Sequence, residues 1–240
     1  MPTGPVIDSA ATLIGAILGT LFSTKVPERL KTMLPLTFGV LSMAMGVVMI
    51  SKVNLLPPVI LAVLIGSTIG ELLKIEQGIG RAAMQVNKWM AIKLPAKSTT
   101  QDNDKFLNGF VAVLVLFSAS GTGIFGAMNE GITHDPSILI SKAFLDFFTA
   151  IIFATSLGAI VAIIVIPQFI ILISLYFLGG IIIPYTTPQL VADFSACGGI
   201  IMLATGFRIA NIKAFPIANM LPALLIVMAL SHYWRIFFQQ

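Results

Sequence analysis

Long runs of apolar residues, separated by short polar segments, cover most of the chain. Eight of these runs approach the length of about 20 residues that a helix needs to cross a bilayer. They lie at about residues 6–22, 33–50, 55–71, 106–125, 138–157, 166–183, 195–209 and 217–233. Because the runs are unbroken and do not alternate between apolar and polar residues, they predict helices and not the strands of a membrane barrel. We therefore predict an all-α, polytopic membrane protein with about eight transmembrane helices.

Composition excludes the other broad classes of protein. The chain is 57% hydrophobic and 10% charged, whereas a soluble domain is about 25% charged. A compact soluble protein could not be solvated with this composition, and a disordered chain would not be so apolar. The lipid bilayer is the expected partner. The net charge of +4 is interpreted as a topology signal and not as a nucleic-acid-binding surface.

A polar segment at residues 74–105 separates the third run from the fourth. Its middle, residues 79–94, combines apolar residues at helical spacing with Arg81, Lys88 and Trp89, which is typical of an amphipathic helix on the bilayer surface. With eight spans, this basic loop and the basic residues after the first and seventh runs fall on the same side. That side is the cytoplasm by the positive-inside rule. We therefore expect a multi-pass membrane protein with both termini outside.

The count of eight spans depends on the uncharged stretch at residues 158–167. We interpret Gly158 and Pro167 as the hairpin between two spans. The alternative is a single long or re-entrant element. It would give seven spans and place the C-terminus, with Arg235, in the cytoplasm.

The first and last thirds of the chain are similar at an offset of about 160 residues. The matched positions are residues 19–27 with 180–188, Gly39 with Gly199, and Gly46 with Gly206. An odd number of crossings separates the first span from the sixth, so the two copies would have opposite orientations. The alternative is a chance match, since glycine and proline are common in membrane helices.

The repeat predicts how the single membrane domain, residues 1–240, is organised. Repeat one covers about residues 5–73, and repeat two covers about 166–234. Between them lie the basic loop with its surface helix, 74–105, and a central helix pair, 106–157. An inverted three-helix repeat that flanks a central pair is typical of secondary transporters.

Lys142 and Asp146 are charged residues one turn apart inside the apolar run at 138–157. Each would cost about 2.5–3.5 kcal/mol at the centre of a membrane helix. Their i, i+4 spacing places them on one helix face, so we expect that face to contact protein or water. The alternative is an internal salt bridge that only fixes this helix.

The segment before this pair adds further candidates. Gly121, Gly123 and Gly126, followed by Asn129 and Glu130, are expected to break the fourth helix and expose backbone carbonyls. Asp135, before Pro136, is typical of an N-cap of the fifth helix. Asn219 lies near Pro222 in the last run. The predicted substrate-binding or ion-binding residues are therefore Asp146, Lys142, Glu130, Asn129, Asp135 and Asn219.

Motifs of enzymes and metal sites are scarce. Two histidines and one cysteine, far apart, predict no metal site, and Walker-type or zinc-protease motifs are missing. The fragment at 118–121 resembles the Gly-x-Ser-Gly of rhomboid proteases, with His232 as a conceivable base, but position 118 is serine. We expect no enzyme and no cofactor.

Four segments resemble the YdfK/YqgA family of bacterial inner-membrane proteins, the domain of unknown function numbered 554. They are SASGTGIFGAMNEGITHDPSILISKAFLDFFTAIIF at 118–153, VPERL at 26–30, IGELL at 69–73 and LATGFRIANIKAFPIANMLPALL at 203–225. The resemblance implies a polytopic protein of the cytoplasmic membrane, but no activity and no binding residues.

Two functions from different classes remain open. The first is a secondary transporter or ion-coupled permease that binds a small solute or ion at Lys142 and Asp146. The second is a non-transporting oligomeric scaffold or channel-like assembly partner. In it the small-residue faces at Gly15/Gly19 and Gly66/Gly70 would form a homo-oligomer.

Overall fold

The computed structural model describes residues 1–22, 27–81, 85, 117 and 120–238, and this part of the chain is helical with no strands. Its helices are α1 (Thr3–Leu21), α2 (Glu28–Ile50), α3 (Leu56–Leu73), α6 (Gly121–Thr133), α7 (Ser137–Leu157), the 3-10 helix η1 (Gly158–Ile164), α8 (Val165–Ile182), η2 (Ile183–Tyr185), α9 (Pro188–Ile209), α10 (Ile217–Met220) and α11 (Pro222–Phe238). Seven helical segments of the described residues are long and apolar enough to cross a membrane. The predicted class, a polytopic all-α membrane protein, is confirmed.

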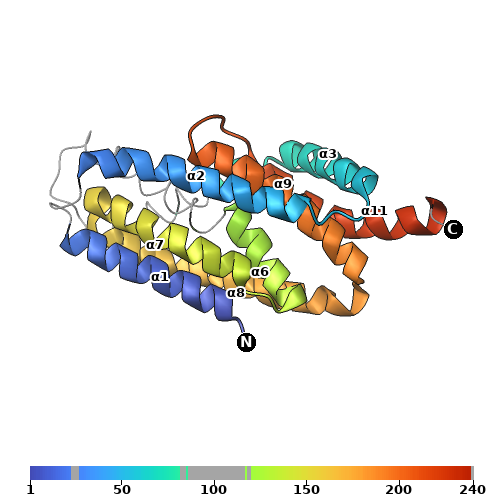
Figure 1. The fold of residues 1–240 in the computed structure, drawn as a ribbon, viewed down its shortest axis with the longest axis horizontal. Helices are drawn as coiled ribbons and strands as arrows, with labels where there is room; N and C mark the ends of the chain where they lie inside the picture. The colour runs from blue at the N-terminus through green and yellow to red at the C-terminus, as the bar shows by residue number, and fades with distance from the viewer. Residues whose placement is uncertain (23–26, 82–84, 86–116, 118–119, 239–240) are drawn as a thin grey trace.

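The helices pack as pairs that are distant in the sequence. The most extensive pairings are α1 with α7, α2 with α9, α6 with α8, and α3 with α11. Figure 1 shows α1, α7 and α8 side by side, α2 alongside α9, and the short α6 inclined steeply to them. Most helix–helix packing in the described residues therefore joins segments far apart in the sequence.

At the crossing of α2 and α9 the two backbones are in close contact. A Cβ atom added to Gly46 would lie 2.6 Å from the carbonyl oxygen of Gly199, and one added to Gly199 would lie 2.6 Å from that of Gly46. Gly39 and Gly206 make the same reciprocal contact, at 2.7 and 2.6 Å. The pairing of 39 with 206 and of 46 with 199 means that the two helices are antiparallel. Only glycine permits backbones to come this close.

The small-residue faces that were candidates for an oligomer interface are buried inside the chain. Cβ atoms at Gly15 and Gly19 would lie 2.3 Å from backbone oxygens of α7. Cβ atoms at Gly66 and Gly70 would meet backbone atoms of Ala223 and Asn219. The prediction that these two faces join separate molecules is therefore wrong. A homo-oligomer through another surface stays a prediction.

The uncharged stretch at 158–167 is a connection between two helices. α7 ends where Gly158 adopts a φ of 73°, which is a conformation that glycine adopts without strain. After η1, α8 packs on α6 and α1. Its Gln168 contacts Asp146 of α7, and its Leu172 belongs to one core cluster with Leu139 of α7 and Ala127 of α6. The interpretation as two spans holds for these residues. Most of the expected fourth run and of the surface helix at 79–94 lies outside the described residues.

Two helix boundaries differ from the prediction. α9 begins at Pro188, with Thr187 as its N-cap, and not at about residue 195. As a result Asp193 lies within the helix, where it is buried. The glycine-rich segment is also helical: α6 runs without a break from Gly121 to Thr133.

The glycine contacts predict the response to added methyl groups. Gly46→Ala and Gly199→Ala should each lower the free energy of unfolding by about 1–3 kcal/mol, because backbone must move to admit the new Cβ. Gly180→Ala is the matched control, since its Cβ would lie 3.9 Å from the nearest atom. Unfolding of the purified protein in detergent would measure all three. Equal stability of the Gly46 and Gly180 variants would contradict the close crossing.

Candidate functional site

A cluster of polar side chains lies buried where α1, α7 and α8 meet. It consists of Asp8 and Thr12 on α1, Lys142 and Asp146 on α7, and Gln168 on α8, and we call it the charged cluster. Nζ of Lys142 donates to Oδ2 of Asp8 at 2.8 Å and also to Oδ2 of Asp146. The lysine is therefore shared between two carboxylates.

The amide of Gln168 binds the same two carboxylates. Its Nε2 atom lies 3.0 Å from Oδ2 of Asp8 and 3.1 Å from Oδ2 of Asp146. It also lies 3.2 Å from Oγ1 of Thr12. One ammonium and one amide thus hold the two acids together, and the five side chains come from three separate helices.

Helix geometry explains why these residues meet. Lys142 and Asp146 share one face of α7 by their i, i+4 spacing, as do Asp8 and Thr12 on α1. α1 and α7 run parallel, since Gly4 packs on Leu139 and Gly19 packs on Ile151. Asp8 lies one turn after Gly4 on α1, and Lys142 lies about one turn after Leu139 on α7, so Asp8 and Lys142 face each other.

The charged cluster is buried, and only the Asp146 side chain, 13% exposed, reaches the surface among its charged groups. The exposed fraction of Asp8 and Gln168 is 0%, and that of Lys142 is 3%. Two carboxylates and one ammonium leave one excess negative charge when all three are ionised. Buried charges are costly unless they are paired and hydrogen-bonded, and here Oδ1 of Asp8 and Oε1 of Gln168 have no hydrogen-bond partner.

Glu130 lies next to the cluster but has a different partner. Both of its carboxylate oxygens lie 3.0 Å from the backbone nitrogen of Gly4, in the first turn of α1 and one turn before Asp8. The N-terminus of a helix carries partial positive charge and unpaired N–H groups, which stabilise a carboxylate. Glu130 is 2% exposed. The structure therefore assigns it to the start of α1, inside the bundle.

Asn129 and Asp135 do not contact the cluster. The Asn129 amide donates to Thr133 within α6. Asp135 is exposed, and it accepts hydrogen bonds from the backbone N–H of Ser137, at 3.0 Å, and from the Ser137 hydroxyl. These bonds to Ser137 lower the pKa of Asp135. The expected role of Asp135 at the start of the fifth helix agrees with these contacts, although the residue assigned as N-cap of α7 is Pro136.

The glycine-rich segment before Asn129 packs closely and does not expose backbone. Ser120 caps α6 by accepting the N–H of Gly123 at 3.1 Å. Cβ atoms at Gly126 and Gly131 would meet side chains of α7 and the backbone of α8. The chain is non-helical at Ser120, directly before Gly121, and then forms one continuous helix through Asn129 and Glu130. The expected break of the fourth helix therefore lies at the start of the glycine-rich segment and not at Asn129 and Glu130.

Asn219 belongs to a separate polar group, around the ends of α3 and α9. Its Nδ2 atom donates to Glu71 at 2.6 Å, and its Oδ1 accepts the N–H of Glu76 at 2.8 Å. Glu76 in turn accepts the N–H of Ala218 and pairs with Arg208. These bonds fix the short helix α10 against the end of α3, and they do not place Asn219 with Asp146.

Asp193 is a further buried acid with a structural role. Its Oδ1 accepts the N–H groups of Asn54 and Leu55 at 2.8 and 2.7 Å. These are the last residues before α3, so Asp193 caps that helix from the side of α9. It also accepts the hydroxyl of Ser231.

Sequence reasoning missed three members of the charged cluster, namely Asp8, Thr12 and Gln168. A usable signal was present. Asp8 lies inside the first apolar run with Thr12 one turn later, and Gln168 is a lone amide in the run at 166–183. Polar residues in membrane helices generally face the protein interior or a polar cavity. The pairing across α1, α7 and α8 could not be predicted without the packing.

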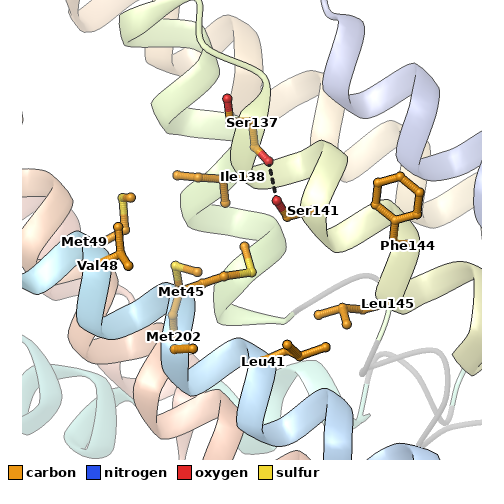
Figure 2. Close-up of a pocket in the computed structure, with 11 residues that line it drawn as sticks. Leu41, Met45, Val48, Met49, Ser137, Ile138, Ser141, Phe144, Leu145 and Met202 are labelled. Atoms are coloured by element: carbon orange, nitrogen blue, oxygen red, sulfur yellow. Dashed lines mark hydrogen bonds between the residues drawn. The ribbon is translucent and has the colours of Figure 1, made fainter.

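A crevice of about 520 Å³ lies between α2, α7 and α9, on another face of α7. Figure 2 shows its mostly apolar walls, with Met45 and Met49 opposite Phe144, and Ser141 donating to the Ser137 carbonyl. None of the five cluster residues lines it. Among the described residues no group of three acids, histidines or cysteines could hold a metal ion. Ser118 lies outside those residues, and His232 is exposed on α11.

Comparison with known proteins finds relatives along nearly the whole chain. Residues 3–232 match the family described as a protein of unknown function, DUF554. The uncharacterized protein YqgA of Escherichia coli is 48% identical, covering 99% of this chain and 100% of its own length. The uncharacterized membrane protein YdfK of Bacillus subtilis is 25% identical over 93% of each chain. No solved structure matches significantly.

The shared lysine predicts strong coupling within the cluster. Lys142→Met should destabilise the protein by about 3–5 kcal/mol, because it leaves two buried carboxylates without their counter-charge. Adding Asp8→Asn should recover part of that loss, so the two substitutions should depart from additivity by about 0.5–3 kcal/mol.

Unfolding in detergent of the two single variants and the double variant measures this coupling. Lys213→Met, at an exposed lysine, is the control and should change stability by less than about 0.5 kcal/mol. Strict additivity of Lys142→Met and Asp8→Asn would show that the two side chains do not act on each other.

Proposed function

The chain belongs to the DUF554 family, and we propose that it is an ion-coupled secondary transporter of the bacterial cytoplasmic membrane. The observation that carries this proposal is the charged cluster, which joins α1, α7 and α8 deep among apolar helices. The transported substrate is a small solute or ion. The relatives from two bacteria, one of them called a membrane protein, support the location.

The energetic cost of the cluster supports a functional role. Ionised side chains within a membrane helix are costly, and well-packed apolar residues in their place are often as stable or more so. A structural salt bridge needs one acid and one base. This cluster has a second acid, and therefore an excess charge that a bound cation can neutralise.

The positions of the contacts support an inverted repeat. Asp8 and Gln168 are 160 residues apart and hydrogen-bond to each other, and so do Ser42 and Met202, through the Ser42 hydroxyl and the Met202 carbonyl at 3.1 Å. The offset of the repeat is also about 160. A residue that contacts its own counterpart lies on the axis that relates two copies. The charged cluster would thus lie on that axis.

The reciprocal glycine contacts follow the same rule. The repeat matches Gly39 with Gly199 and Gly46 with Gly206. A two-fold axis between the two copies exchanges matched residues, so it converts the contact between Gly39 and Gly206 into a contact between Gly199 and Gly46. Both contacts are present, with nearly equal distances. Gly19 and Gly179 each pack on the backbone of a central helix, α7 or α6, although the repeat matches Gly19 with the adjacent Gly180.

This arrangement suits alternating access. In an inverted repeat the two copies can exchange conformations, and a site on their axis then opens to one side and later to the other. Asp8 lies in repeat one, Gln168 in repeat two, and Lys142 with Asp146 in the central pair. In the proposed cycle, loss or gain of a bound ion changes the net charge of the cluster. This changes how strongly the cluster holds repeat one, repeat two and the central helix pair together. The structure then corresponds to the closed state between the two open ones.

Burial of the cluster favours a second candidate, a membrane scaffold without transport. In the described residues every charge of the cluster has a partner within the protein, and the crevice beside α7 does not include them. A dry pair of this kind can serve only to fix α1 against α7. Direct measurement of flux separates the two candidates.

The transporter proposal predicts loss of flux in variants of the cluster. The full chain in liposomes would be tested for uptake of a panel of ions and small metabolites. Asp146→Asn and Lys142→Met should each reduce the rate about tenfold or more, equivalent to about 1.4 kcal/mol. Asp135→Asn and Lys213→Gln, both at exposed positions away from the cluster, should keep the rate. Unchanged flux in the two cluster variants would refute the assigned site, and absence of any flux would favour the scaffold.

A further inference from the structure

Two buried oxygen atoms of the charged cluster lack a hydrogen-bond donor. They are Oδ1 of Asp8 and Oε1 of Gln168, on side chains that are both 0% exposed. An unsatisfied buried acceptor costs about 1–3 kcal/mol, and most buried polar atoms in proteins have a partner. The structure therefore leaves two buried acceptors of the cluster without a donor.

The two unsatisfied atoms belong to side chains that are already joined at their other ends. Nε2 of Gln168 donates to Oδ2 of Asp8 at 3.0 Å. A carboxylic acid and a primary amide can form a ring of two hydrogen bonds, in which the amide N–H donates to one carboxyl oxygen and the acid O–H donates to the amide oxygen. A proton on Oδ1 of Asp8 would supply the missing donor and complete this ring with Oε1 of Gln168.

The cluster needs one further positive charge to become neutral, because it has two carboxylates and one ammonium. Among the residues that the structure describes, the titratable groups that face Asp8 are Lys142 and Asp146, both from α7. From α6 there is Glu130, one turn away on Gly4. Gln168 from α8 and the η1 segment contribute no titratable group. Since Glu130 is held by the N-terminus of α1, the excess charge is shared by Asp8 and Asp146, and one proton makes the cluster neutral.

A metal cation fits these residues less well than a proton. Hard cations are bound by a shell of six or more oxygen ligands, whereas in the cluster the Lys142 ammonium and the Gln168 amide nitrogen already bind both carboxylates. Repulsion from the ammonium disfavours a second cation between them. A proton needs no coordination shell and binds to one oxygen atom.

We propose that the coupling ion of this transporter is a proton, which binds to Oδ1 of Asp8 and makes that side chain a carboxylic acid paired with the Gln168 amide. This inference rests on the transport function proposed above. Binding converts the carboxylate and one proton into a neutral acid, and release reverses it with no other bond broken. After release, two carboxylates share one lysine, and their repulsion weakens the attachment of α1 to α7 and α8.

Infrared difference spectroscopy of the full chain in lipid tests the protonated carboxyl. Because all ten acidic residues of the chain give C=O bands when they are protonated, the Asp8 band is identified as the difference between the wild-type and Asp8→Asn spectra. We expect this band at low pH and its loss as the pH rises. The band should be absent in Asp8→Asn, which keeps the shape of the side chain. It should shift in Gln168→Leu, which keeps Asp8 and removes its partner, and it should persist in Asp135→Asn. Absence of the band in the wild-type protein, or its persistence in Asp8→Asn, would overturn the proposal.

Flux measurements separate this proposal from the transport function on which it rests. A pH gradient imposed on the liposomes should drive uptake, whereas a sodium gradient at constant pH should not. Uptake driven only by sodium, without an Asp8 band, would overturn the proton and leave transport intact. An Asp8 band together with no flux of any tested solute would support the protonation of Asp8 and refute the proposed transport function.

Discussion

The shared lysine is the interaction on which the interior of this protein depends. Lys142 holds Asp8 and Asp146 together, and Gln168 binds both acids from a third helix. Removing the lysine leaves repulsion between buried carboxylates, and removing an acid leaves the lysine with one partner. Because α1, α7 and α8 carry these groups separately, the packing of three helices is coupled to the charge on a few atoms. That coupling is what a transporter requires, since binding of an ion must change how helices pack.

Glycine lets the remaining helices approach closely around this centre. Reciprocal backbone contacts at Gly39 with Gly206 and at Gly46 with Gly199 join α2 to α9, while Gly19 and Gly179 pack on the central helices. Apolar side chains give little driving force for association within lipid, so backbone contact and buried polar bonds have to hold the bundle together. Acids at helix ends add to this. Glu130 caps α1 and Asp193 caps α3, and both bonds join elements far apart in the sequence.

The sequence predicted the helical class, most spans and the pair at Lys142 and Asp146, because length, apolar character and i, i+4 spacing are local properties. It did not predict Asp8 and Gln168 as partners, since their meeting depends on the pairing of α1 with α7 and α8. Asn129, Glu130 and Asp135 were grouped with the pair because they are near it in the chain, but their partners are Thr133, Gly4 and Ser137. The small-residue faces of α1 and α3 were assigned to an oligomer interface. Their sequence pattern shows that another helix can approach the backbone closely, but it does not show which helix does so.

Accessibility of the cluster from the two sides of the membrane is the most direct test of its central role. Ser9 is 5% exposed and adjacent to Asp8, and Cys197 is the one cysteine of the chain. A Ser9→Cys variant in a Cys197→Ala background can therefore be treated with a membrane-impermeant thiol reagent in vesicles of each orientation. If the cluster is alternately exposed, the new thiol will react slowly from both sides. A thiol that reacts from neither side, or from one side only, would contradict alternating access.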